Sequence, residues 1–199
     1  MMDSQLTFWH WFDAHQDELV DFEVDQERIF DDLSEQLTRV HPNLTFEFGP
    51  KADRREFVIS AGGIREAFPA VSSLVAAAPK LDRWHITAFR PRRTPLNSIQ
   101  IGEICIGPGD VEFSLLTKGS TIGIQLFIPG FQENDVTFKQ IAYLMLDDAL
   151  GEYDVETKVG LIKMLPPEAP RTARRYPFAE LPSLFDQLAS TLAVPSLPN

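Results

Sequence analysis

The chain contains very little cysteine, because Cys105 is the only one among its 199 residues. A single cysteine excludes an intramolecular disulfide and any metal site built from several cysteines. Such scarcity is typical of proteins from a reducing compartment. Free cysteine side chains are usually buried as small apolar groups. We therefore expect Cys105 to lie in the core.

Long apolar runs are also missing from the sequence. No uninterrupted apolar stretch approaches the roughly 18 residues that a membrane span needs. The first residues, Met-Met-Asp-Ser-Gln, lack the basic and apolar segments of a signal peptide. We therefore expect a soluble, cytoplasmic protein that does not bind membranes. The 44% of hydrophobic residues, with 15 Phe and three Trp, are enough for a substantial core.

Motifs for metal binding and nucleophilic catalysis are absent. No GlyxSerxGly sequence occurs, and the segment Lys118-Gly-Ser-Thr is typical of a hairpin turn. His85 follows Trp84 on a predicted strand and is interpreted as a buried, hydrogen-bonded residue. None of the four histidines has the spacing of a zinc motif: His10, His15, His41 and His85. We predict no catalytic residue, no metal and no cofactor.

Five carboxylates lie close together in the sequence between residues 147 and 156. Asp147 and Asp148 fall in the last turn of a predicted helix, and Glu152, Asp154 and Glu156 follow on one face of a predicted strand. Alternate residues of a strand stand roughly 7 Å apart and do not converge on one ion. We interpret this group as the solvated face of an edge strand.

Charge of one sign is concentrated at the N-terminus of a chain with a net charge of −11. Residues 1–36 hold eleven acidic side chains and one basic side chain, Arg28, which leaves a net charge of −1 for residues 37–199. The apolar spacing predicts helices over residues 4–20 and 26–40 that pack through one side, with Asp25 as the cap of the second. The residues expected to face inward are Leu6, Trp9, Phe12, Leu19, Ile29, Phe30, Leu33, Leu37 and Val40.

The order strand, strand, helix, strand occurs twice and predicts an α+β fold with a mostly antiparallel sheet. The predicted elements are residues 44–48, 56–61, a helix ending near 78, and 84–90, then 111–117, 122–128, 135–150 and 155–164. We predict a single domain of residues 1–199. Its parts are an acidic helical segment (1–40), a first ββαβ repeat (41–93), a second (94–166) and an extension with a short helix (167–199).

Local signals refine three of these elements. Pro69 predicts either a kink or a helix start, because it lacks the amide hydrogen of a helix interior. Residues 99–106 are expected to form a strand with a bulge near Gly102. Asn134 or Asp135 is expected to cap the following helix, and Gly151 to end it in a left-handed conformation.

Arg90, Arg92 and Arg93 are the sharpest charge cluster in the sequence. Three guanidinium groups at the end of a strand could bind phosphate or carboxylate. We include Arg65 and the pair formed by Gly62 and Gly63 as further members of an anion site, since they precede a helix. The alternative is that these arginines are solvated or pair with the acidic helices. The glycine spacing matches neither a P-loop nor a dinucleotide fingerprint.

Arg171, Arg174 and Arg175 form a second basic group, with the same two interpretations. Neither basic group is long, and a chain with a pI of about 4.8 repels polyanions over most of its surface. We therefore predict no nucleic-acid partner.

Three segments resemble a family of bacterial hypothetical proteins with no assigned function. They are residues 8–12 (Phe-Trp-His-Trp-Phe), residues 41–50 (His-Pro-Asn-Leu-Thr-Phe-Glu-Phe-Gly-Pro) and residues 84–93, which end in Ala-Phe-Arg-Pro-Arg-Arg. The similarity runs through most of the first 130 residues. It implies a bacterial cytosolic protein and assigns no catalytic residue, cofactor or substrate.

Two functional hypotheses follow from the sequence. The first is a non-catalytic protein-binding protein, for example an inhibitor, whose acidic segment attracts a basic protein partner. The second is a small-molecule enzyme or ligand binder that holds an anion near Arg90, Arg92 and Arg93. A pocket with converging polar groups beside these arginines would favour the second hypothesis.

Overall fold

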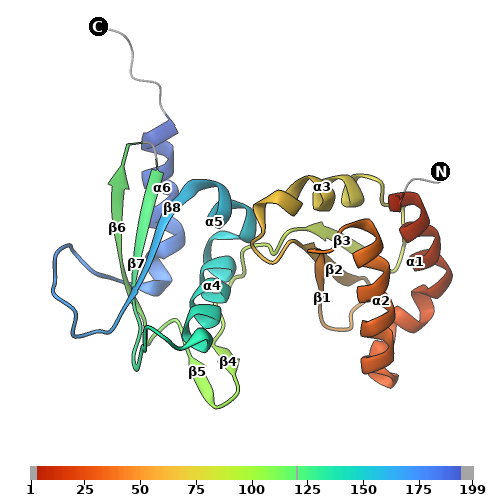
Figure 1. Ribbon diagram of the computed structural model, residues 1–199, viewed down its shortest axis with the longest axis horizontal. Helices are drawn as coiled ribbons and strands as arrows, with labels where there is room; N and C mark the ends of the chain where they lie inside the picture. Colours follow the sequence, from red (N-terminus) through yellow and green to blue (C-terminus); the bar gives the residue numbers. More distant parts are fainter. Residues whose placement is uncertain (1–3, 120, 194–199) are drawn as a thin grey trace, which may run out of the picture. The chain divides into compact units, whose positions relative to one another are not determined.

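The structure is a computed structural model that describes residues 4–119 and 121–193 (Figure 1). It has the α+β architecture that the sequence predicts, and the chain divides into two compact units. Unit 1 is Met1–Arg90 and unit 2 is Pro91–Asn199. Each unit has its own hydrophobic core.

Unit 1 places helices against a three-stranded sheet (Figure 1). Strand β2 is central, pairing antiparallel with β1 and parallel with β3. Its elements are α1 (Ser4–Val20), η1 (Phe22–Val24), α2 (Gln26–Val40), β1 (Thr45–Phe48), β2 (Arg55–Ser60), η2 (Arg65–Ala67), α3 (Phe68–Ala76) and β3 (Trp84–Ala88).

Aromatic side chains fill the core of unit 1. The ring of Phe12 stacks on that of Phe57 with centroids 5.0 Å apart, and the indole of Trp9 donates a hydrogen bond of 2.8 Å to the Leu74 carbonyl. Phe30 and Val40 pack partly buried against this core. The other residues expected to face inward are buried, except Leu6: Trp9, Phe12, Leu19, Ile29, Leu33 and Leu37.

Leu6 is exposed, and Phe8 takes the buried position in the first turns of α1. At about 100° per residue, Leu6 is turned away from the stripe that Phe8, Phe12 and Leu19 form. The prediction for Leu6 was therefore wrong. Asp25 does not cap α2 either, because its carboxylate accepts a 2.7 Å hydrogen bond from the Arg28 side chain.

Pro69 lies in the first turn of α3, where a missing amide hydrogen leaves no intrahelical bond unmade. The predicted helix start is therefore confirmed. Gly62 and Gly63 form the preceding turn with φ angles of 58° and 78°, which glycine adopts without steric cost.

Unit 2 contains a four-stranded sheet in the order β8-β7-β6-β9 and a separate β4-β5 hairpin. Strand β7 pairs antiparallel with β6 and parallel with β8. The elements are β4 (Ile99–Ile101), β5 (Ile104–Ile106), β6 (Glu112–Lys118), β7 (Thr121–Phe127), α4 (Val136–Leu150), α5 (Glu152–Lys158), β8 (Val159–Leu165), β9 (Tyr176–Pro177), η3 (Phe178–Glu180) and α6 (Leu181–Ala193).

Residues 155–158 are helical, so the predicted strand over 155–164 begins too early. Gly151 ends α4 with φ 80° and ψ 140°, and a second helix, α5, starts directly after it. Acidic residues in the first turn of α5 and Lys158 in its last turn favour the helix dipole. The carboxylates after Gly151 therefore do not line a strand face, and Glu152 is buried.

Residues 99–106 form a hairpin, not a bulged strand, because Gly102 turns the chain with φ 59°. Cys105 lies opposite Gln100 on its outer side and is exposed, so the prediction of a core cysteine was wrong. His85 is also exposed, since it alternates with the buried Trp84 on β3.

The cap of α4 is confirmed, because Asp135 accepts a 2.8 Å hydrogen bond from the Thr137 amide.

Candidate functional site

Arg90 and Arg92 are bound to carboxylates within their own units. In unit 1, Arg90 forms an ion pair with Glu47. In unit 2, Arg92 bonds to Asp186 at 2.8 and 2.9 Å, to Asp154 at 2.9 Å and to the Leu150 carbonyl at 2.8 Å. These carboxylates raise the pKa of Arg92, which in turn lowers the pKa of Asp186. Each of these two guanidinium groups therefore stabilises contacts within its own unit.

The other members of the predicted anion site are placed as follows. The Arg93 amide donates a 2.8 Å hydrogen bond to the Asp148 carbonyl, and Arg65 is exposed at the start of η2. The Gly62 amide donates to the Ser60 hydroxyl at 2.9 Å, so this donor is used inside the turn. An anion site at these residues stays a prediction.

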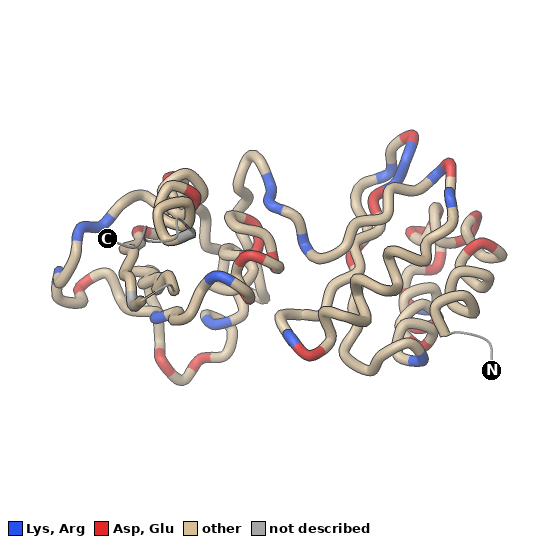
Figure 2. The backbone as a smooth tube through the Cα atoms, turned by 90° about the horizontal axis from the view of Figure 1, so that it is seen from above, with Lys and Arg blue, Asp and Glu red and all other residues tan. Residues whose placement is uncertain are grey.

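Seven carboxylates of the acidic segment form ion pairs with basic side chains of unit 1, and residues 1–90 keep a net charge of −7, from 9 basic and 16 acidic side chains. Arg28 alone contacts three carboxylates at 2.7 to 3.1 Å. Figure 2 shows Lys and Arg positions interspersed with the acidic ones in this unit. The carboxylates in ion pairs are those of Asp17, Glu18, Asp21, Glu23, Asp25, Asp32 and Glu35. A basic partner would compete with these internal cations for the paired carboxylates.

The second basic group has mixed placements. Arg175 is buried with its guanidinium 3.5 Å from the centroid of the Phe127 ring, and it donates to the carbonyls of Pro167 and Ala169. Arg174 lies over the ring of Tyr176, whereas Arg171 is exposed. Arg175 is thus a structural residue that fixes the loop after β8. Among the described residues, no group of three or more His, Cys, Asp or Glu side chains could hold a metal ion.

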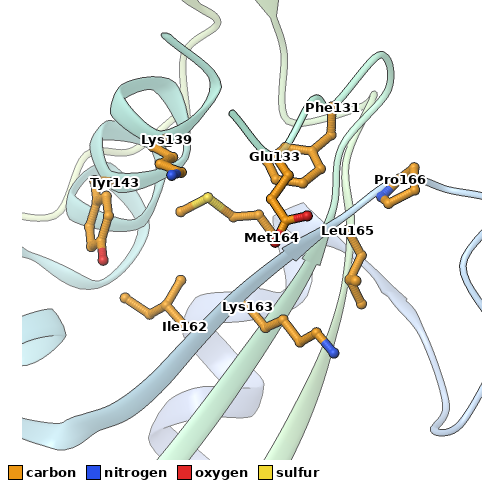
Figure 3. A pocket seen from close by; sticks show the side chains of 9 residues that line it. All are labelled: Phe131, Glu133, Lys139, Tyr143, Ile162, Lys163, Met164, Leu165 and Pro166. Carbon is orange, nitrogen blue, oxygen red and sulfur yellow. The ribbon is translucent and has the colours of Figure 1, made fainter. Parts of the chain in front are cut away.

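A groove of about 700 Å³ lies between α4 and β8 within unit 2 (Figure 3). In Figure 3, Met164 extends from β8 toward Lys139 and Tyr143 of α4, while Lys163 points away from α4. We call this feature the β8 groove. It is lined by Phe131, Glu133, Lys139, Tyr143, Ile162, Lys163, Met164, Leu165 and Pro166.

Strand β8 lies at the edge of its sheet, and its outer side pairs with no described strand. The Leu165 carbonyl accepts a 2.9 Å hydrogen bond from the Ile128 amide, so the backbone groups of Leu165 point toward β7. Because these groups alternate in direction along a strand, those of Ile162 and Met164 point away from β7, toward the β8 groove.

The helix wall of the β8 groove exposes apolar surface. Lys139 and Tyr143 are on one side of α4 together with Val136, by their helical spacing. Tyr143 lines the groove and is 44% exposed, and Val136, on the same side of α4 but outside the lining, is 62% exposed. Large apolar side chains that stay in water beside a groove often mark a binding surface.

The two lysines of the β8 groove differ from three other basic side chains of unit 2. Neither Lys139 nor Lys163 forms an ion pair with a carboxylate among the residues that the structure describes. By contrast, Arg92, Lys158 and Arg175 each have a carboxylate partner. The groove therefore presents two ammonium groups without an ion-pair partner among the described residues, together with one carboxylate, that of Glu133.

The β8 groove is not among the sites that the sequence predicts. Lys139 and Tyr143 have the spacing of a solvent-facing helix surface, and Lys163 has that of an ordinary strand position. The groove depends on β8 being an edge strand. The sequence predicts an edge strand here, but from carboxylates that the structure places on α5 and not on β8.

Comparison of the chain with protein-family models, with curated proteins and with solved structures finds no match. The resemblance to a bacterial family therefore stays a prediction. None of the helices in the described part of the chain combines the length and the apolar character that crossing a membrane would require.

Proposed function

We propose that this protein is a non-catalytic protein-binding protein and that the β8 groove holds a segment of its partner. The observation that carries the proposal is the unpaired edge of β8 beside a groove of about 700 Å³. Edge strands in many proteins bind partner segments through main-chain hydrogen bonds, and adjacent pockets select the side chains. The β8 groove has both features.

The polar groups of the groove favour binding over acid–base chemistry. Among the described residues, Glu133, Lys139 and Tyr143 form no hydrogen bond with one another. Residues that transfer protons in an enzyme are usually held by such bonds. The apolar lining from Phe131 and Met164 instead suits side chains that are buried on association.

The composition of unit 1 suggests a binding surface on its acidic segment. The ion pairs of that segment instead favour a binding surface at the β8 groove. Arg28, Arg55 and Arg83 hold carboxylates of the acidic segment in place. A basic partner would have to displace these internal cations to reach them. Binding of a basic partner to the acidic segment is thus a weaker hypothesis than binding at the β8 groove.

The proposal is tested by selecting binders from a displayed library of random peptides with the full chain as bait. The selected peptides should bind the Tyr143→Glu variant about tenfold more weakly, because a carboxylate in the groove disrupts its apolar wall. Tyr153→Glu is the matched control, since Tyr153 is exposed on α5 and does not line the groove.

Two results would contradict the proposal. The library could yield no peptide that binds, or the selected peptides could bind Tyr143→Glu as tightly as they bind the unmodified chain. Either result would remove the β8 groove as a binding surface for protein segments.

A further inference from the structure

We infer that the occupant of the β8 groove is an acidic, extended segment of a partner protein, which joins the sheet as a new strand beside β8. This inference rests on the proposed function and names the chemistry of the partner. It depends on the backbone direction of β8, on the side chains above and below its edge, and on the two unpaired lysines.

The backbone of β8 determines that the occupant is extended. The amide and carbonyl groups of Ile162 and Met164 point away from β7. A partner strand can exchange hydrogen bonds with both residues, whereas a helix satisfies its own backbone groups and leaves this edge unused. Strand β8 has seven residues, enough for pairing over a typical strand length.

The side chains along β8 determine an alternating pattern in the occupant. Ile162 and Met164 lie on the face toward α4, because they pair with Ile124 and Leu126 of the core. Leu161 and Lys163 lie on the opposite face by strand alternation. Every second side chain of an added strand would therefore enter the groove, and the others would flank Lys163.

The lysines determine the charge of the occupant. Lys139 stands on the α4 wall of the groove and Lys163 on the opposite face of β8, so carboxylates on either face of an added strand meet an ammonium group. Cross-strand pairs of opposite charge stabilise a sheet, and neither lysine has a competing partner among the described side chains.

A second copy of this chain is a poorer occupant than an acidic segment. Antiparallel pairing of two β8 strands centred on Lys163 would place two ammonium groups opposite each other on one face. They would form a non-hydrogen-bonded pair, in which the side chains lie closest together. Lysines on edge strands commonly prevent such self-pairing.

The inference is tested with synthetic peptides of about nine residues, a common strand length. One peptide alternates Glu and Val, a second alternates Lys and Val, and a third is the Glu-Val peptide with every second amide N-methylated. The full chain should bind the Glu-Val peptide at least about tenfold more tightly than the Lys-Val peptide. N-methylation should abolish binding, because it removes the donors that pair with β8.

Two pairs of variants locate the peptide. Met164→Pro should weaken binding of the Glu-Val peptide about tenfold relative to Met164→Ala, since both lose the side chain and only proline loses the outward amide hydrogen. Lys163→Glu should weaken binding more than Lys80→Glu, which changes the net charge equally and lies in unit 1. The N-methylated peptide keeps the test decisive if Met164→Pro fails to fold.

Failure of this inference is distinguishable from failure of the proposed function. If library-selected peptides require Tyr143 but are neutral or basic, or tolerate N-methylation, the inference is overturned and the groove remains a protein-binding site. Self-association that Met164→Pro suppresses would instead identify a second copy as the occupant. If no peptide of any composition binds, both proposals fall.

Discussion

In both units an antiparallel strand pair is followed by a helical connection to a third strand that runs parallel to the second. This third strand, β3 in unit 1 and β8 in unit 2, lies at an edge of its sheet. The two edges differ in the side chains that contact their outward backbone groups. At β3, Arg54 donates two hydrogen bonds, of 2.6 and 3.1 Å, to the outward carbonyl of Trp84, the first residue of the strand.

The edge of β8 has no comparable cover among the described residues. Its outward residues, Ile162 and Met164, border the β8 groove, and its unpaired lysine, Lys163, lies between them. The two edge strands thus differ in whether a side chain bonds an outward carbonyl. Uncovered strand edges are the positions where a sheet can accept another strand.

Both units hold an arginine whose side chain is almost fully buried, Arg55 in unit 1 and Arg175 in unit 2. Arg55 is 2% exposed and contacts the Val20 and Gly49 carbonyls, the Glu23 carboxylate and, 4.3 Å away, the ring of Phe22. It joins η1 to β2 and so fixes the acidic segment on the sheet. We therefore expect the stability of unit 1 to depend strongly on Arg55.

The largest expected effect is that of Arg55→Ala. It leaves buried carbonyls without a donor and creates a cavity, so the free energy of unfolding of unit 1 should fall by about 3 kcal/mol. All three tryptophans, Trp9, Trp11 and Trp84, lie in unit 1, so tryptophan emission in a urea titration measures this transition. Arg39→Ala is the control, because Arg39 is exposed. Equal urea midpoints for the two variants would contradict the structural role of Arg55.

The next largest effect concerns the link between α4 and α5, which has no counterpart in unit 1. Gly151→Ala places a Cβ at φ 80° and ψ 140°, a region essentially restricted to glycine, and should cost unit 2 about 2 kcal/mol. Hydrogen exchange should become faster in α5 and β8. Gly109→Ala is the control, since a Cβ there would meet no atom within 4 Å. If hydrogen exchange in α5 is unchanged, a side chain at position 151 does not strain the link between α4 and α5.

Most elements could be predicted from the sequence where one short-range pattern decided them. The helix over residues 26–40 agrees with α2, because five apolar residues at helical spacing and the stop at His41-Pro42 have one interpretation. Residues 155–158 were misassigned, since Val155 and Val159 with intervening polar residues resemble a strand. The helical state of this segment depends on Gly151, which precedes it, and on the burial of Val155 in the core of unit 2.

The candidate site could not be predicted by the same reasoning. The anion site rested on arginines adjacent in sequence, yet Arg90 and Arg92 are engaged by Glu47 and Asp186, whose positions in the sequence are distant. The β8 groove likewise depends on which strand ends the sheet. Such features require the pairing of residues far apart in the chain, which local periodicity does not specify.

A smaller effect is expected from the pH dependence of unit 1. Hydrogen bonding to Arg55 lowers the pKa of Glu23 from 4.5 to about 2. The stability from this charge is therefore complete above pH 4.5 and is lost as the pH falls toward 2. Glu23→Gln should flatten the acid dependence of the tryptophan transition in that window, whereas the exposed control Glu27→Gln should not. Parallel acid profiles for both variants would contradict the assigned role of Glu23.

The smallest effect on stability, and the most direct test of the comparison, is that of Arg54→Ala. Arg54 is exposed and bonds one carbonyl, so its loss should lower the free energy of unfolding by only about 1 kcal/mol. It should nevertheless open the edge of β3, and the variant should self-associate more readily with concentration in analytical ultracentrifugation. Arg83→Ala removes the same charge from an exposed ion pair and should not. If Arg54→Ala keeps the mass of the unmodified chain at all concentrations, then covering the outward carbonyl is not what closes β3. The absence of such a cover would then no longer distinguish β8 as a binding edge, and the groove with its lysines would have to account for binding alone.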